Sequence, residues 1–280
     1  MNGFGRRFRG ALPGLAVAVA AAVSVAGCAG GATLSAKSSS PTAPAVQLVV
    51  FAAASLRDVL KQVEAAYEVE HPGIDIVVST GSSAALRAQI EQGAPADIFL
   101  SADTVNPQRL ADAGLSADDP VPFAGNRLAI IVPIANPAGI ADPADLARPG
   151  LKIIAAGERV PITAYATEAI QALGALPGYP AGFAEAYAQN VVSREEDVGS
   201  VVARIELREG DAAIVYATDA LASSLATTIP IPDVADPTAV YAGVVIGASD
   251  HREEATGFLA WLVGPVGEAI LADAGFLPPA

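Results

Sequence analysis

The chain has 280 residues, of which 52% are hydrophobic and 16% are charged, and its formal net charge at pH 7 is −14. This acidic excess excludes nucleic acid as a partner, because neutralising phosphates requires a basic surface. The hydrophobic share is ample for a buried core.

The chain begins with a segment typical of a secretory signal peptide. Three arginines within the first nine residues are followed by an apolar run of small residues at 11–26, and no acidic residue precedes Cys28. The run is short and consists mostly of Ala and Val, which makes it a poor permanent membrane span. Its end, Val-Ala-Gly-Cys at 25–28, resembles a bacterial lipobox, in which the thiol would carry diacylglycerol. We therefore expect residues 1–27 to be a lipoprotein signal peptide and Cys28 to be lipidated; the alternative is an ordinary signal peptide with an incidental cysteine.

The stretch after this cysteine predicts a tether to the membrane. Residues 28–45 are rich in Gly, Ala, Ser, Thr and Pro and carry one charge, Lys37. Cys28 is the only cysteine, so no intrachain disulfide can form. Without the three arginines of the signal segment, the mature chain carries 13 basic and 30 acidic side chains, a formal charge of −17. A diffuse charge is screened beyond about 8 Å at physiological salt, so it does not exclude an anionic ligand.

From residue 46 onward, apolar strands alternate with helices. Periodicity predicts strands at 46–51, 74–79, 97–100, 128–132, 151–155, 191–192, 212–216 and 241–246. It predicts helices at 56–70, 83–92, 107–113, 164–173, 181–189, 198–208, 219–224, 252–262 and 266–274. Strands that are apolar throughout and separated by helices favour an α/β fold with mainly parallel sheets flanked by helices.

Two proline-rich stretches, near 120–126 and 225–240, divide the folded part. They predict two α/β lobes joined by two crossings. Lobe I would consist of residues 46–122 and 241–280, and lobe II of residues 123–240. In such sheets a ligand binds outside the carboxyl ends of the strands, which here would face each other across the interlobe cleft.

Small and hydroxylated residues gather where predicted strands give way to helices. The junctions are Ala-Ala-Ala-Ser at 52–55, Thr-Gly-Ser-Ser at 80–83, Pro-Ile-Thr at 161–163 and Asp-Val-Gly at 197–199. Each presents the free N–H groups of a helix start, which attract anions. Several that converge on one cleft can bind a doubly charged oxyanion without Lys or Arg. Each also has a plain structural explanation, because a serine or an aspartate at such a place is usually an N-cap.

Several phrases in order along the chain carry a family resemblance. They are FAAASLRDVL (51–60), SSAALRAQIEQGAPADIFLSAD (82–103), GNRLAIIVP (125–133), VPITAYATEA (160–169), EDVGSVVARIELREGDAAIVYATDA (196–220) and FLAWLVGPVGEAILADAGF (258–276). Through them the chain resembles the periplasmic molybdate-binding proteins from Val46 to Pro278. The resemblance implies a two-lobed type 2 periplasmic-binding-protein fold with the ligand in the cleft. It implies a monomeric extracytoplasmic protein that needs no cofactor and passes molybdate or tungstate to an ABC permease. Together with the lipobox-like sequence, it predicts a lipoprotein anchored at the extracytoplasmic face of the cell membrane.

The resemblance also implies which residues bind the ligand. Hydroxyl donors fall on Ser55, Ser83 and Tyr216, and backbone N–H donors fall on Ile162 and Val198. Ser82 could substitute for Ser83. The family often has Ala-Gly where this chain has Ile162-Thr163, a bulkier loop in which backbone donation survives. The donors would reach the oxygens of the oxyanion, so no side chain would ligate the metal directly.

Enzymes and other oxyanion binders are the alternatives. We expect no enzyme, because Ser55 has neither a nucleophile-elbow glycine pattern nor a recognisable His partner, and no His/Cys cluster suits a metal. A purely structural or adhesive surface lipoprotein is a further alternative. Sulfate has the same charge and shape as molybdate, so a sulfate- or other oxyanion-binding protein of the same fold stays open. Hydrogen phosphate would need an acceptor carboxylate, which the predicted ligand set lacks.

Overall fold

The computed structural model describes residues 46–279. The predicted signal peptide, Cys28 and tether lie outside these residues. Within 46–279, no single helix is long and apolar enough to cross a membrane. Two consecutive helices, α8 (Arg252–Leu262) and α9 (Pro265–Asp273), reach that composition only together, and they are bent by 57° at their junction.

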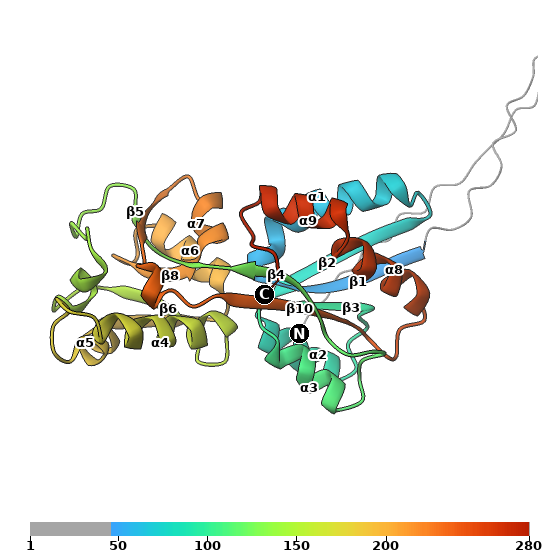
Figure 1. The fold of residues 1–280 in the computed structure, drawn as a ribbon, viewed down its shortest axis with the longest axis horizontal. Coiled ribbons are helices and arrows are strands. Elements are labelled where there is room, and N and C mark those ends of the chain that lie inside the picture. The colour runs from blue at the N-terminus through green and yellow to red at the C-terminus, as the bar shows by residue number, and fades with distance from the viewer. Residues whose placement is uncertain (1–45, 280) are drawn as a thin grey trace, which may run out of the picture. The chain divides into compact units, whose positions relative to one another are not determined.

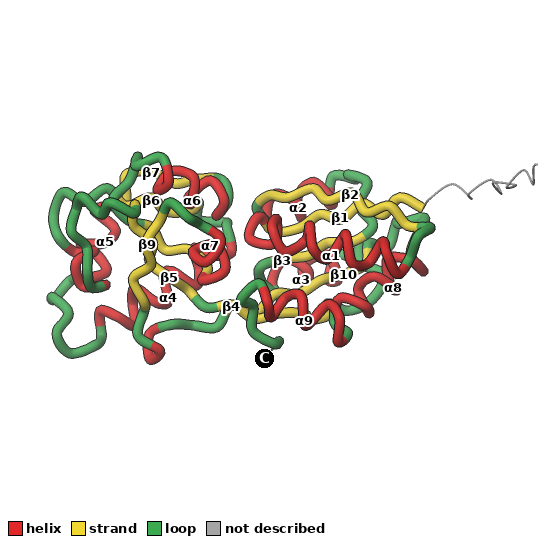
Figure 2. Tube along the Cα trace, turned by 90° about the horizontal axis from the view of Figure 1, so that it is seen from above, coloured by secondary structure: helices red, strands yellow, loops and turns green. Residues whose placement is uncertain are grey.

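The first lobe is a five-stranded sheet with helices on both faces (Figures 1 and 2). Its strands in spatial order are β2 (Ile74–Gly81), β1 (Val46–Ala53), β3 (Ile98–Ser101), β10 (Ala239–Val245) and β4 (Val121–Asn126). β1 pairs in parallel with β2 and β3, whereas β10 pairs antiparallel with β3 and β4. The sheet is therefore mixed, with its antiparallel part at the strands that lead to and from the second lobe.

Helices cover the two faces of this sheet because each has one apolar side. Helix α1 (Arg57–Glu70) buries Val59, Leu60, Val63 and Tyr67, which recur at helical spacing. It lies with α8 and α9 on one face, and α2 (Ser83–Glu91) and α3 (Val105–Asp112) lie on the other (Figures 1 and 2).

The second lobe holds two smaller sheets. One has the order β8 (Ala213–Tyr216), β5 (Leu128–Pro133) and β9 (Ala226–Pro230), all antiparallel; the other pairs β6 (Ile153–Ala156) in parallel with β7 (Val191–Glu195). A parallel bridge from Ile153 to Ala212 joins the two sheets. The helices of this lobe are α4 (Pro161–Gly174), α5 (Phe183–Asn190), α6 (Val198–Glu206) and α7 (Ala217–Ala222).

Two strands escaped the sequence prediction, and both contain proline. β4 includes Pro122 and β9 ends at Pro230, so both were read only as proline-rich crossings. Each is an edge strand, where a missing N–H costs no ladder hydrogen bond. The lobe limits predicted at 122 and 241 fall inside β4 and β10, which both belong to the first sheet. We therefore propose that the chain leaves the first lobe near Asn126 and returns near Ala239.

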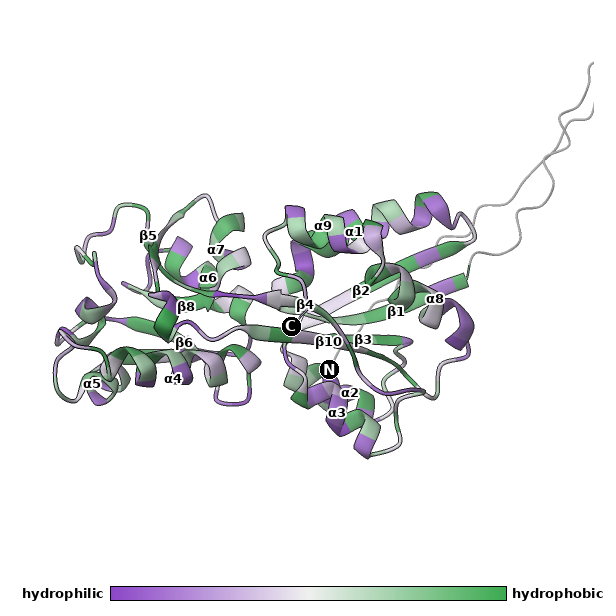
Figure 3. Ribbon diagram, viewed as in Figure 1, coloured by the Kyte–Doolittle hydropathy of each residue, from purple (hydrophilic) through white to green (hydrophobic). Residues whose placement is uncertain are grey.

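One continuous hydrophobic core runs through both lobes. It joins Leu48, Val50 and Leu100 of the first sheet to Ile130 and Val215 of the second lobe, all buried. Figure 3 shows hydrophobic residues along the strands of both lobes, while helices such as α1 and α4 carry hydrophobic and hydrophilic patches in turn. The apolar strands are therefore buried in the core, and the polar strand-to-helix junctions lie at their ends.

Candidate binding site

The structure brings four of the five predicted ligand residues to one small cavity between the lobes. Ser55, Ser83, Val198 and Tyr216 line a narrow cavity of about 10 Å³. Its remaining lining consists of Ala53, Ala54, Gly81, Ser82, Ala102, Val160, Pro161 and Asp197. Ile162 does not line the cavity, although the two residues before it do. All five predicted residues are buried, with at most 8% of any of them exposed.

The first lobe contributes two serines at strand-to-helix junctions. Ser55 lies in a 3₁₀ turn (Ala54–Leu56) between β1 and α1, and Ser83 is the first residue of α2. The Ser83 Oγ accepts a hydrogen bond from the Ala102 N–H at 3.1 Å. Its hydroxyl proton is therefore available to a ligand. Ser82 is the N-cap residue of α2 and also lines the cavity, so the structure allows either Ser82 or Ser83 to contact a ligand.

The second lobe contributes the starts of two helices. Helix α6 begins at Val198, and Asp197 caps it by accepting from the Ser200 N–H at 2.8 Å. This confirms the prediction that Asp197 is an N-cap, and it turns one oxygen of the only acidic cavity residue toward its own helix. Helix α4 begins three residues earlier than predicted, because Pro161 fits the first helical position.

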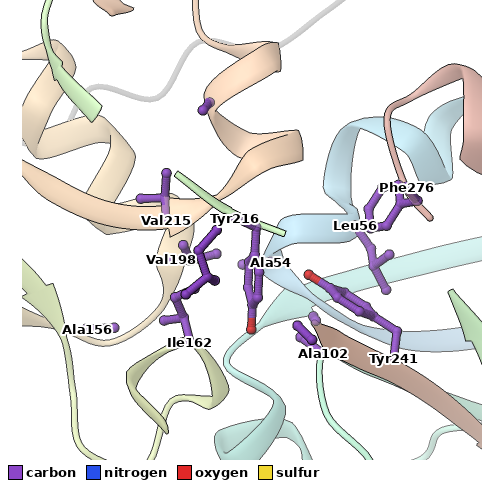
Figure 4. Packing of buried hydrophobic residues seen from close by; sticks show 14 of the residues in the cluster. Ala54, Leu56, Ala102, Ala156, Ile162, Val198, Val215, Tyr216, Tyr241 and Phe276 are labelled. Atoms are coloured by element: carbon purple, nitrogen blue, oxygen red, sulfur yellow. The ribbon is translucent and has the colours of Figure 1, made fainter. Parts of the chain in front are cut away.

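The earlier start of α4 changes the setting of Ile162. Its N–H belongs to the first turn of the helix, where such groups have no partner within the helix. Its side chain is 2% exposed and packs in the core. Figure 4 shows Tyr216 between Ile162 on one side and Tyr241 on the other. Ile162 can therefore offer only its backbone to a ligand.

Tyr216 ends β8 with a hydroxyl group that has no hydrogen-bond partner among the described residues, although it is sealed from solvent. Burial raises its pKa well above the ordinary value, so the hydroxyl stays a donor at physiological pH. A buried polar atom without a partner costs free energy and is uncommon in native proteins. The Tyr216 hydroxyl on the cavity wall therefore gains a hydrogen-bond partner only when a ligand binds.

Sequence reasoning missed a chain of buried hydrogen bonds behind Ser55. The Ser55 Oγ and the Tyr241 hydroxyl oxygen are 2.8 Å apart. The Asn126 Nδ2 donates to the Tyr241 oxygen at 3.4 Å and to the Thr218 Oγ1 at 2.8 Å. These partners are separated by 92 to 186 residues along the chain, so no local sequence pattern could reveal them.

No Lys or Arg lines the cavity. Adjoining grooves contain Arg57, which donates to the Thr80 Oγ1 at 3.2 Å and borders Gly199, and Arg159. Among residues 46–279, no group of three or more His, Cys, Asp or Glu side chains is placed to hold a metal ion. The cavity therefore suits a small anion held by neutral donors, and not a bare cation.

The chain can be compared with known proteins on this basis. The family described as bacterial extracellular solute-binding protein matches residues 48–277. The molybdate-binding protein ModA of Mycobacterium tuberculosis (strain ATCC 25618 / H37Rv) is 34% identical over 269 residues, which cover 95% of this chain and 98% of that protein. The putative ABC transporter substrate-binding lipoprotein YvgL of Bacillus subtilis (strain 168) is 30% identical over 262 residues, with coverage of 92% and 95%.

Two solved structures show the same fold. The periplasmic molybdate-binding protein of Azotobacter vinelandii superposes with a TM-score of 0.71 at 25% identity, covering 83% of this chain and all of that one. The sulfate-binding protein SubI of Mycobacterium tuberculosis H37Rv gives a TM-score of 0.73 at 22% identity, with coverage of 83% and 87%, a likeness in fold alone. These likenesses confirm the predicted α/β, two-lobed periplasmic-binding-protein fold. The prediction of mainly parallel sheets is wrong, because the first sheet is mixed and the β8–β5–β9 sheet is antiparallel; apolar strands separated by helices do not fix the direction in which the strands pair.

Proposed function

This chain belongs to the family of bacterial extracellular solute-binding proteins, and we propose that its solute is molybdate or tungstate, which it passes to the membrane permease of an ABC importer. The protein then works by binding alone and is not an enzyme. The relatives compared above are named as binding proteins, in agreement with this assignment.

The observation that carries the proposal is the cavity between the lobes, lined by hydroxyls and helix starts with no cation among them. Molybdate and tungstate are fully deprotonated at neutral pH and need only donors. Hydrogen bonds between neutral donors and a charged ligand contribute about 1.5–3 kcal/mol each. The cavity has a volume of only about 10 Å³, far below the 300–1,000 Å³ of a typical organic-ligand pocket, which favours an ion of few atoms over an organic solute.

Calorimetric titration of the mature domain with molybdate tests the proposal, with hydrogen phosphate as the control anion. We expect saturable binding of molybdate and weak or no binding of phosphate. A ligand that binds only the native state stabilises it by about 4 kcal/mol at a thousandfold excess over Kd, so millimolar molybdate should also raise the Tm. Absence of both a heat signal and a Tm shift with every oxyanion tried would contradict the proposal.

Sulfate is the second candidate solute, favoured by the likeness in fold to a sulfate-binding protein. Sulfate is smaller than molybdate but carries the same charge on the same tetrahedral shape. A competition titration decides between them: molybdate should displace bound sulfate at comparable concentration, and the reverse order of affinity would reassign the solute.

We further propose that the protein is a monomer anchored by lipid on Cys28 at the extracytoplasmic face of the membrane. The lipobox-like Val-Ala-Gly-Cys at 25–28 motivates this, and one relative is named as a lipoprotein. Replacing the thiol in Cys28→Ser should release the protein from the membrane fraction or leave it unprocessed. A variant that stays membrane-bound and processed like the wild type would exclude the anchor.

A further inference from the structure

We propose that Tyr241 and Asn126 are positioning residues that hold the Ser55 hydroxyl as a hydrogen-bond donor toward the cavity, and that they thereby select fully deprotonated oxyanions. This inference rests on the proposed function, because it concerns how the same cavity recognises its solute. It starts from the buried hydrogen bonds that join Ser55 to residues on three other elements.

The orientation of the Asn126 amide is fixed by its neighbour. The Asn126 Oδ1 accepts from the Arg127 N–H at 2.9 Å, so this end of the amide is the carbonyl and the other end carries the two protons. One proton goes to the Thr218 Oγ1 and the other to the Tyr241 hydroxyl oxygen. Tyr241 is therefore an acceptor toward Asn126.

The direction of the next hydrogen bond follows from this. Either oxygen could donate in the hydrogen bond of 2.8 Å between the Tyr241 hydroxyl and the Ser55 Oγ. The other partner of Tyr241 among the described residues, the Asn126 Nδ2, cannot accept, so donation to the Ser55 Oγ is the arrangement that leaves the buried Tyr241 proton paired. Burial raises the pKa of Tyr241 well above its ordinary value, so the proton stays in place. Ser55 thus accepts from behind, and its own proton is directed elsewhere. Because Ser55 lines the cavity, a bound anion is the partner for that proton.

Ser83 is also arranged as a hydrogen-bond donor toward the cavity, through a backbone contact. Its Oγ accepts from the Ala102 N–H, so its proton also remains for the cavity. Two cavity hydroxyls therefore have their acceptor side engaged before any solute arrives, and one oxygen of Asp197 is engaged by the Ser200 N–H. Each engaged hydroxyl directs its proton to the anion, so the acceptors that remain on the cavity are the second Asp197 oxygen and the Tyr216 hydroxyl oxygen. A protonated oxyanion must turn its proton to one of these two groups, whereas a fully deprotonated oxyanion needs neither.

The chain of hydrogen bonds also crosses between the lobes. Ser55 lies in the first lobe, Tyr241 and Asn126 lie on the two strands that lead between the lobes, and Thr218 lies on α7 of the second lobe. The orientation of the Ser55 proton is therefore linked to the paired strands β4 and β10, which carry Asn126 and Tyr241.

The test is a double-mutant cycle of Tyr241→Phe and Ser55→Ala, read by titration with molybdate and with inorganic phosphate. Phenylalanine keeps the ring packing of Tyr241 against Phe123 and Phe276 and removes only the hydroxyl. We expect Tyr241→Phe to weaken molybdate binding about tenfold. It should also reduce the ratio of molybdate affinity to phosphate affinity, because the Ser55 oxygen, no longer bonded to Tyr241, can then accept a proton from hydrogen phosphate. In the Ser55→Ala background, Tyr241→Phe should have no further effect on either anion.

Two further variants make the outcome decisive. Tyr67→Phe is the matched control, because Tyr67 is equally buried but lies on α1 outside the cavity, and its affinities should equal those of the wild type. If Tyr241→Phe fails to fold, Asn126→Leu removes the donor behind Tyr241 and should reduce the same affinity ratio. Additive effects of Ser55→Ala and Tyr241→Phe, or an unchanged anion preference in both Tyr241→Phe and Asn126→Leu, would overturn the inference. Wild-type protein that binds no oxyanion would instead overturn the proposed function.

Discussion

The two lobes supply the cavity with different kinds of donor. The first lobe offers serine hydroxyls that are already held from behind, Ser83 by the Ala102 N–H and Ser55 by Tyr241. The second lobe offers the backbone of two helix starts and the Tyr216 hydroxyl, which has no partner among the described residues. The hydroxyls on the wall formed by the first lobe are thus hydrogen-bonded before a ligand binds, whereas the Tyr216 hydroxyl on the wall formed by the second lobe gains its first hydrogen bond only from a ligand. We therefore expect removal of a hydroxyl to weaken binding on either wall, but to destabilise the ligand-free protein only on the first.

The largest effect is expected on the wall formed by the first lobe, at Ser83. Ser83→Ala removes one donor to the anion and should weaken molybdate binding about ten- to a hundredfold. It also leaves the Ala102 N–H buried without its acceptor, which should lower the free energy of unfolding of the ligand-free protein by about 1–3 kcal/mol. Titration and thermal melts check both effects. Unchanged affinity would shift the role of ligand to Ser82.

Tyr216→Phe should weaken binding by about tenfold but should not destabilise the ligand-free protein. The hydroxyl that it removes makes no hydrogen bond in the described structure, so its loss relieves a buried unpaired donor. The ring contacts with Tyr241 and Tyr165 remain. Ligand-free melts should therefore show an equal or higher Tm alongside the weaker titration. A lower Tm would mean that the two walls do not differ in the way described.

Part of the binding site could be predicted from the sequence alone. Strand-to-helix junctions with small or hydroxylated residues placed Ser55, Ser83 and Val198 at helix starts, and the structure gathers them at one cavity with Tyr216. The edge strands β4 and β9 were missed because proline argues against a strand until its neighbours are known. Tyr241, Asn126 and the state of each hydroxyl could not be predicted, because they depend on hydrogen bonds between residues far apart in the chain.

Asp219 on α7 of the second lobe is a further buried group without a complete set of hydrogen-bond partners, and it lines the groove next to the cavity. Burial raises the pKa of this carboxyl to about 7, against the opposing influence of a backbone hydrogen bond and of Arg57. Asp58 and Asp197 add like charge, and Oδ2 has no partner among the described residues. Because the folded pKa lies above the unfolded one, the contribution of this group to stability is complete below about pH 4 and is lost as pH rises toward 7.

Asp219→Asn should therefore stabilise the protein at pH 8 by about 1–3 kcal/mol, which corresponds to a Tm increase of several degrees. The advantage over the wild type should shrink as pH falls toward 4. Thermal melts of both proteins between pH 4 and 8 check the expectation. Parallel curves across that range would show that Asp219 is ionised throughout in the folded protein.

The smallest effect is expected at Ile162, and it separates backbone donation from side-chain contact. The side chain lies in the core and not on the cavity, so only the N–H in the first turn of α4 can reach an anion. Ile162→Val keeps that N–H and removes one methylene group. We expect molybdate affinity within about twofold of the wild type, with a loss of stability of about 0.5–1.5 kcal/mol typical of this substitution. Lys61→Gln, at an exposed and screened side chain, is the matched control and should change neither quantity measurably. A tenfold loss of affinity in Ile162→Val, without one in Lys61→Gln, would mean that the bulk of this side chain shapes the cavity and that the second wall recognises its ligand by more than its backbone.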